Sequence, residues 1–132
     1  MNELIQAYKE TDFNVYEPKI TIKVGQVNQE LDRLLQSYNC IIWAYITAWN
    51  PYSELTDDRT NEEKNNQLKN DLTEYILLAG EGVGSDQSWQ PEKSFLILGI
   101  ALDDAVIIGK KYRQNAIVVG RIYEEPQLIW IK

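Results

Sequence analysis

Hydrophobic positions alternate or cluster in short segments along the chain, and this pattern predicts a sheet of several strands. Alternation at residues 13–15 and 20–24, separated by Glu17-Pro18-Lys19, predicts an antiparallel hairpin that turns at the proline. The apolar run from Cys40 to Ala48 predicts a buried central strand. Further strands are expected at residues 75–79, 94–100, 116–119 and 127–131, with the last two paired as a hairpin about residues 124–126.

Three other segments have apolar residues at helical spacing. The first contains Val27, Leu31, Leu34, Leu35 and Tyr38, with Asn28 as its expected N-cap. The second covers residues 57–73 and has the spacing of a capping box at Thr60-Asn61-Glu62-Glu63. The third begins at Asp103 or Asp104 and directs Ala105, Ile108 and Tyr112 inward.

The order of these segments indicates the fold class. The second helix joins the strand that ends at Ala48 to the strand at residues 75–79, which favours a right-handed crossover with parallel pairing. With the antiparallel hairpins, this predicts an α+β protein. We expect a mixed β-sheet of about six to seven strands with about three helices, in a single domain over residues 1–132.

Composition agrees with one globular domain. Of the 132 residues, 44% are hydrophobic and 11% aromatic, which suffices for a core without metals or disulfides. The single cysteine, Cys40, cannot form an internal disulfide, and we expect a small buried hydrophobe there, with a reactive thiol as the alternative. Residues 1–6 lack the apolar core of a signal peptide, and no apolar run reaches the ~20 residues of a membrane span. These features predict a cytoplasmic protein without a membrane partner.

Charge and the lack of histidine exclude several functions. The formal net charge of −7 repels phosphate backbones and argues against nucleic acid as a partner. Lys110-Lys111-Tyr112-Arg113 is a local exception, either as cations at the end of a helix or as an anion-binding rim. The absence of histidine excludes Ser-His-Asp and Cys-His catalysis and the usual zinc sites. Carboxylate chemistry, a hard cation, or binding through amides and aromatics remain.

Amide side chains stand where predicted strands end or begin. Trp49-Asn50-Pro51 closes an apolar strand with a turn, where Asn50 can cap the turn or face a ligand while Trp49 shelters it. Asn61 and Asn65 lie four residues apart on one helix face, which is either solvated or a hydrogen-bonding wall for a polar ligand. Gln114-Asn115 precedes another strand and presents the same alternatives.

Carboxylates in the segment that follows residue 79 are the candidate catalytic groups. Residues 80–84, Gly-Glu-Gly-Val-Gly, are expected to form a flexible loop, but lack the Lys-Ser/Thr of a phosphate-binding P-loop. Glu81, Asp86 and Glu92 are each either solvated, an acid or base, or part of a cation site, and we assign no metal there. Glu92 is the better candidate and Glu81 the second, because the aromatic Trp89 could desolvate Glu92 and raise its pKa.

These segments together resemble a family described as a domain of unknown function, DUF3293. The resemblance rests on residues 46–51, 61–68, 80–82, 89–96 and 114–116, whose order and spacing agree over nearly the whole chain. The corresponding positions are Thr47, Trp49, Asn50, Pro51, Asn61, Asn65, Glu81, Trp89, Pro91, Glu92, Ser94, Gln114 and Asn115. Residues 64–67 depart from the family, where more arginine is expected, and this argues against an anion-binding role for that helix. The family consists of small bacterial proteins without an assigned activity, so the resemblance implies one domain and no mechanism.

Three functional hypotheses follow. The first is a domain that binds a polar or nucleotide-like small molecule in a cleft at strand ends, with Glu92 or Glu81 as general acid or base if it is an enzyme. Its expected ligand-binding residues are Trp49, Asn50, Asn61, Asn65, Trp89, Ser94, Gln114 and Asn115; no cofactor is indicated. The alternative is an acidic protein-interaction module, a regulator or inhibitor without catalysis, whose carboxylates cluster on one face. In the third, the motifs only form turns and caps. An apolar edge strand at residues 128–131 would also allow a homodimer.

Overall fold

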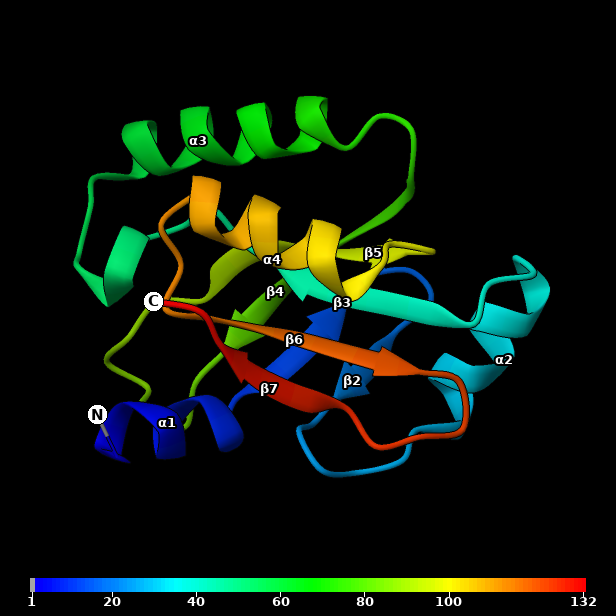
Figure 1. Ribbon diagram of the computed structural model, residues 1–132. Helices are drawn as coiled ribbons and strands as arrows, with labels where there is room; N and C mark the ends of the chain where they lie inside the picture. Colours follow the sequence, from blue (N-terminus) through cyan, green and yellow to red (C-terminus); the bar gives the residue numbers. More distant parts are fainter. Residues whose placement is uncertain (1) are drawn as a thin grey trace.

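The computed structural model describes residues 2–132, which form one seven-stranded sheet and four α-helices (Figure 1). The strands are β1 (Asp12–Val15), β2 (Ile20–Ile22), β3 (Ile42–Ile46), β4 (Ile76–Val83), β5 (Glu92–Leu98), β6 (Ala116–Arg121) and β7 (Gln127–Trp130), in the order β2-β1-β4-β5-β3-β6-β7. The α+β class and the number of strands are confirmed, as are the hairpins β1–β2 and β6–β7. Every neighbouring pair is antiparallel, so the sheet is not the mixture that we expected.

The expected parallel pairing of β3 and β4 is wrong. Both strands run antiparallel to β5, which lies between them and pairs Phe95 with both Ile46 and Ala79. After β3 the chain passes through the helix of residues 58–71 and enters the sheet again as β4, two positions away from β3. One strand position therefore stays open between β3 and β4. A loop of residues 84–91 then returns β5 into that gap, because antiparallel neighbours can be joined by a short connection.

The segment Gly80–Val83 continues β4 and is not the flexible loop that we predicted. Its backbone pairs with β1 on one side and β5 on the other. Close approach explains the glycine at position 80, since a Cβ there would lie 1.8 Å from the backbone oxygen of Asn14. The hydroxyl of Tyr45 donates to the same oxygen at 2.6 Å, so this corner of the sheet has no room for a side chain.

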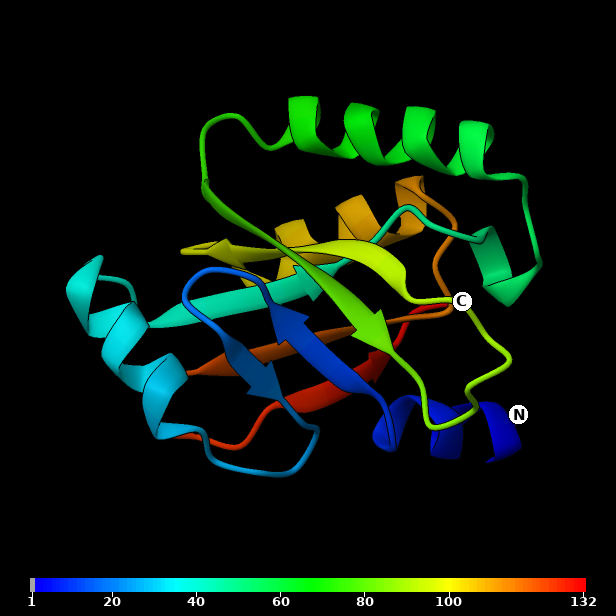
Figure 2. The same ribbon diagram turned by 180° about the vertical axis from the view of Figure 1, so that it is seen from behind.

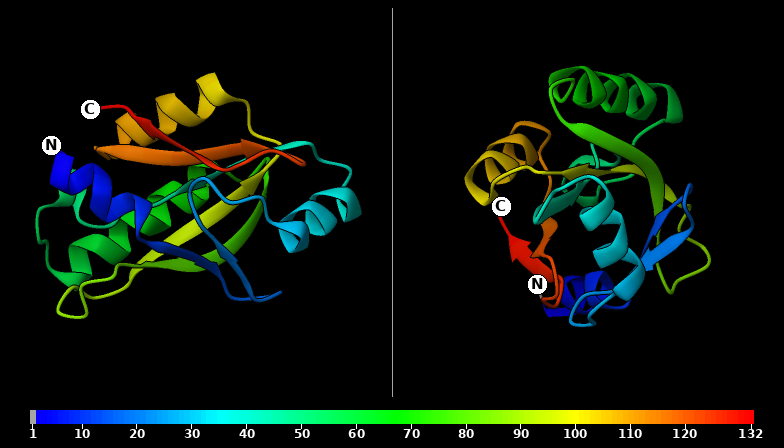
Figure 3. Two further views of the ribbon diagram at one scale, coloured as in Figure 1. Left: turned by 90° about the horizontal axis from the view of Figure 1, so that it is seen from below. Right: turned by 90° about the vertical axis from the view of Figure 1, so that its right-hand side faces the viewer.

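Alternate residues of the central strands form two apolar clusters on opposite faces of the sheet. One face carries Trp43, Tyr45, Leu96 and Leu98, and the other carries Ala44, Ile46, Phe95 and Ile97. Helices α3 (Asp58–Asp71) and α4 (Leu102–Lys111) cover the second face, which we call the outer face (Figures 1 and 2). The sheet curls around the first face, which we call the concave face. There α2 (Gln29–Ser37) packs, and α1 (Asn2–Lys9) lies between β7 and the β1–β2 hairpin (Figure 3).

Helix starts agree with the sequence pattern only in part. Asn28 caps α2 as predicted, with its side-chain oxygen accepting from the Leu31 amide at 3.0 Å. The cap of α3 is Asp57, which accepts from the Thr60 amide, so the capping box that we placed at Thr60 is wrong. Asp57, three residues earlier, instead accepts from the Thr60 amide and adds a favourable charge at the positive end of the helix.

Two further helices also differ from expectation. The expected cap of α4 at Asp103 or Asp104 is wrong, because the N-cap is Ala101 and both aspartates lie in the first turn. Helix α1 was not predicted, although Leu4, Ala7 and Tyr8 have helical spacing; the helix is only eight residues long and none of them is fully buried. Cys40 is partly exposed beside the concave-face cluster rather than buried, because it precedes β3 in a loop. Within residues 2–132, no helix is long and apolar enough to cross a membrane.

Candidate functional site

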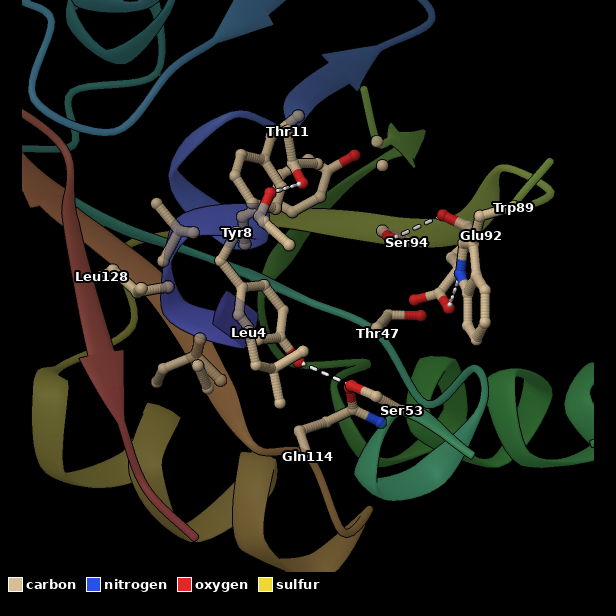
Figure 4. Close-up of a pocket in the computed structure, with 18 of the residues that line it drawn as sticks. Leu4, Tyr8, Thr11, Thr47, Ser53, Trp89, Glu92, Ser94, Gln114 and Leu128 are labelled. Carbon is tan, nitrogen blue, oxygen red and sulfur yellow. Dashed lines mark hydrogen bonds between the residues drawn. The ribbon is translucent and has the colours of Figure 1, made fainter. Parts of the chain in front are cut away.

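A cavity of about 320 Å³ lies on the concave face, between the sheet, α1 and the loop of residues 84–91. Apolar side chains, among them Leu4, Phe13, Tyr45 and Leu128, form most of its lining. Figure 4 shows Leu4 and Leu128 toward one end of the cavity and the polar side chains of Thr47, Ser53 and Glu92 toward the other. The pocket is therefore amphipathic, with an apolar body and a polar end.

Two acidic residues, Asp86 and Glu92, line the described cavity. Glu92 lies at the polar end and is the first residue of the central strand β5. Its Oε2 accepts hydrogen bonds from Trp89 Nε1 and Asn50 Nδ2, each at 3.0 Å. Burial raises the pKa of this carboxyl above its usual value, and the two hydrogen bonds offset part of that rise. The sequence-based expectation of a raised pKa at Glu92 is confirmed.

The raised pKa of Glu92 has a consequence for stability. The folded protein holds this proton to a higher pH than the unfolded chain, whose value is about 4.5. The contribution of Glu92 to the free energy of unfolding therefore falls as the pH rises from about 4.5 through the raised pKa. Glu92→Gln does not titrate, so urea unfolding from about pH 4 to 8 should show the variant gaining on the wild type as pH rises. A constant difference across this range would contradict the prediction.

A reciprocal pair of amides fixes the turn that precedes the pocket. The Asn50 backbone amide donates to Asn61 Oδ1 at 2.9 Å, and Asn61 Nδ2 donates back to Asn50 Oδ1 at the same distance. Asn61 Nδ2 also reaches the backbone oxygen of Thr56, while Asn65 Oδ1 accepts from the Ala48 amide. Asn61 and Asn65 are buried, so this face of α3 is not solvated. Instead the amides attach the loop of residues 48–56 to α3.

The attached turn has an unusual backbone. Asn50, Tyr52 and Ser53 have φ values of 45°, 54° and 61°, in the left-handed region that residues other than glycine seldom adopt. Each such residue costs on the order of 1–3 kcal/mol, and the surrounding structure must compensate. The Tyr52 amide donates to the Arg113 carbonyl at 2.7 Å, and the Asn50–Asn61 pair holds the other end. This strain is concentrated where the turn brings Ser53 to the pocket.

Ser53 joins a small polar network at the pocket wall. Its Oγ lies 3.1 Å from the Tyr8 hydroxyl and accepts from Asn115 Nδ2 at 3.0 Å (Figure 4 shows the Tyr8–Ser53 bond). Burial raises the pKa of Tyr8, and the charge of Glu92 adds to the rise. Tyr8 is thus a protonated hydroxyl that can donate or accept. Asn115 Oδ1 is buried and has no hydrogen-bond partner within residues 2–132.

The structure brings together part of the predicted site. Trp89, Glu92, Ser94 and Gln114 line the cavity. Five other predicted residues do not line it: Trp49, Asn50, Asn61, Asn65 and Asn115. Of these, the four amides hold the surrounding loops by hydrogen bonds, and Trp49 is buried. Gln114 has a supporting bond too, since its Nε2 donates to the Tyr112 carbonyl at 3.2 Å.

Glu81, the second catalytic candidate, is not brought to the pocket. It pairs across the strands with Lys93, whose ammonium contacts Glu62 of α3 on the outer face. Glu81 itself accepts from the Tyr16 hydroxyl at 2.8 Å. The expectation that Glu81 and Glu92 share one cleft is therefore wrong, because adjacent positions of the paired strands alternate between faces.

Other predicted features have local roles. Asp86 lines the rim of the cavity and accepts from the Ser88 amide and hydroxyl. Within residues 2–132, no group of three potential ligands among histidine, cysteine, aspartate and glutamate is arranged to hold a metal ion. Lys110 and Lys111 lie in the last turn of α4, as the helix-end interpretation predicts. Lys111 also forms an ion pair with Asp71 at 2.6 Å.

Sequence reasoning missed Tyr8 and Ser53. Tyr8 lies on the unpredicted helix α1, and its ring packs edge-on against Trp130 of β7. Ser53 is the only serine between Ser37 and Ser85, but nothing in the local sequence indicates that it faces a pocket, and the left-handed turn is what places it there. For Ser53, the available signal was the Asn50-Pro51 dipeptide. This dipeptide marks a turn, but it does not indicate which of the following side chains the turn presents.

The fold and the pocket define an α+β protein in which a curled antiparallel sheet and a short helix enclose an amphipathic cavity. Residues 46–117 match the family model described as "Protein of unknown function (DUF3293)", and the chain belongs to this family. The matched range contains Thr47, Ser53 and Glu92 but not α1, and it is shorter than the nearly full-length agreement that we expected. Comparisons with curated proteins and with solved structures gave no match.

Proposed function

We propose that this protein binds a small molecule in the concave-face pocket, with an apolar body against the sheet and a hydrogen-bonding group at Glu92. The observation that carries the proposal is the half-buried Glu92 carboxylate at the polar end of a mainly apolar cavity. Such a cavity with few polar groups is the usual form of a ligand site, and a carboxyl with a perturbed pKa is typical of one. The strained turn at Ser53 supports the same location.

The lining refines the class of ligand. No lysine or arginine is among the residues that line the cavity in the described chain, so a phosphate group would meet no counter-charge. This favours a molecule of the size of a nucleobase or an aromatic metabolite over a nucleotide. If the molecule is a substrate, Glu92 is the proton acceptor at the reacting group, because it is the carboxylate at the polar end.

The acidic interaction module receives less support from the distribution of charge. That hypothesis requires carboxylates gathered on one exposed face. Acidic side chains instead occur on α1 and α2, at the concave face, and on α3 and α4, at the outer face. We therefore base the proposed function on the pocket.

A fragment screen by ligand-observed NMR tests the proposal. We expect aromatic fragments with a hydrogen-bond donor to bind the wild type and to lose about tenfold in affinity in Glu92→Gln, because a bond to a charged acceptor is replaced by a neutral one. Glu81→Gln is the matched control, since it makes the same chemical change on a residue outside the cavity. Its affinities should equal those of the wild type.

The result that would overturn the proposal is equally specific. It is a broad fragment set with no hit on the folded wild type, or hits that Glu92→Gln and Glu81→Gln weaken alike. Urea unfolding of both variants, measured in parallel, shows that any loss of binding occurs in folded protein.

A further inference from the structure

Among residues 2–132, no basic side chain forms an ion pair with the Glu92 carboxylate. Its two hydrogen-bond donors, the Trp89 indole and the Asn50 amide, are both neutral. The adjacent Lys93 is directed to the outer face, where its ammonium contacts Glu62 at 2.5 Å. Among the residues that line the described cavity there is neither lysine nor arginine. A carboxylate removed from water without a counter-charge is costly, as the raised pKa of Glu92 reflects.

The two oxygens of this carboxylate are used unequally. Both hydrogen bonds from the protein go to Oε2. No residue in the range 2–132 donates to Oε1, although Glu92 lines the cavity. Figure 4 shows the carboxylate next to Thr47 at the polar end of the pocket. The protein thus orients one oxygen with neutral donors and leaves the other available to a ligand in the cavity.

The remaining surroundings also suit a positive group. The rings of Tyr8, Phe13, Tyr45 and Trp89 line the cavity, and aromatic faces attract cations. The Tyr8 and Ser53 hydroxyls can accept further hydrogen bonds. The chain carries a formal charge of −7, which raises the local concentration of cations around the protein.

We infer that the ligand of this pocket is an organic cation, a protonated amine or amidine carried on an apolar or aromatic body, whose N–H group binds Glu92 Oε1. This inference rests on the proposed function and specifies its ligand class. The cation supplies the counter-charge that the described lining of the cavity lacks, while its body occupies the apolar part of the cavity. A neutral ligand would leave the carboxylate unbalanced, and an anion would be repelled by it.

Three probes of nearly equal size and shape test the inference: 2-phenylethylamine, 2-phenylethanol and phenylacetate. Their dissociation constants are measured by NMR titration at about pH 7.5, where the amine is protonated. We expect the amine to bind the wild type at least about tenfold more tightly than the alcohol, because it forms a charge-assisted hydrogen bond. Phenylacetate should bind more weakly than the alcohol. Glu92→Gln should reduce the preference for the amine to less than about twofold, while Glu81→Gln keeps it.

The outcomes separate this inference from the proposed function. If the alcohol binds the wild type as tightly as the amine, and Glu92→Gln still weakens both more than Glu81→Gln does, the cation inference is overturned and the pocket remains a ligand site. If neutral fragments bind and the amine does not, the inference is overturned in the same way. If Glu81→Gln abolishes the preference as fully as Glu92→Gln, both the inference and the proposed site are overturned. If neither the three probes nor the fragment set binds, the proposed function itself fails.

Discussion

Gly80→Ala adds a single methyl group and is expected to lower the free energy of unfolding by at least about 3 kcal/mol. The added Cβ would lie 1.8 Å from the Asn14 carbonyl oxygen and 3.1 Å from the Tyr45 hydroxyl. The first contact is with backbone, so it cannot be relieved by turning a side chain. Strands β1 and β4 must move apart instead, which breaks the pairing next to Val15. Urea denaturation monitored by tryptophan fluorescence measures the loss.

Gly82→Ala is the control for this substitution. It lies two residues further along β4, on the same face, where a Cβ would meet its nearest neighbour at an ordinary 3.8 Å. We expect its free energy of unfolding to remain within about 1 kcal/mol of the wild type, since alanine also favours an ordered backbone over glycine. Equal effects of the two substitutions would show that the close approach at position 80 does not exist.

Asn61→Ala is expected to cost about 3 kcal/mol and to weaken ligand binding as well. The side chain is buried and makes hydrogen bonds to the Asn50 amide, the Asn50 side chain and the Thr56 carbonyl. Truncation leaves buried backbone groups without partners, which is more costly than the loss of an exposed hydrogen bond. It also frees the strained turn, so that Ser53 no longer stays at the pocket wall. Chemical unfolding and the amine titration report the two effects separately.

Asn66→Ala provides the matched comparison on the same helix. Asn66 is exposed in the middle of α3, so its replacement should raise stability by a few tenths of a kcal/mol through helix propensity alone. Its affinity for 2-phenylethylamine should be that of the wild type. A similar loss in Asn61→Ala and Asn66→Ala would mean that the amide pair does not determine the conformation of the turn.

Local patterns predicted the elements that depend on neighbouring residues. The alternation at Phe13 and Ile20 located the first hairpin, and the spacing of Leu31 and Leu35 located α2 with its Asn28 cap. Such periodicity records which side of an element is buried. It does not record which strand becomes the neighbour of another, and β5 therefore entered between β3 and β4 without a sequence signal.

The candidate site was predictable to the same extent. The sequence indicated that Trp89 lies near Glu92 and that the carboxyl is partly removed from water, but not that Trp89 Nε1 donates to the carboxylate, a bond that opposes the rise in its pKa. The four-residue spacing of Asn61 and Asn65 placed them on one face of a helix but gave no indication of which way that face points. Tyr8 is placed at the pocket by contacts between residues distant in sequence, such as its hydrogen bond to Ser53 and its edge-on contact with Trp130, and no local pattern encodes these.

The attachment of the turn to α3 consists of uncharged groups. Amide side chains do not change charge between acidic and alkaline solution, and dissolved salt does not screen their mutual hydrogen bonds as it screens ion pairs. The Asn50–Asn61 pair therefore has no charge of its own to gain or lose, and its one direct link to a titrating group is the hydrogen bond from Asn50 Nδ2 to Glu92 Oε2. If the pocket binds an organic cation as we infer, protonation of Glu92 on acidification removes the charge that holds that cation, while the Asn50–Asn61 pair itself stays uncharged.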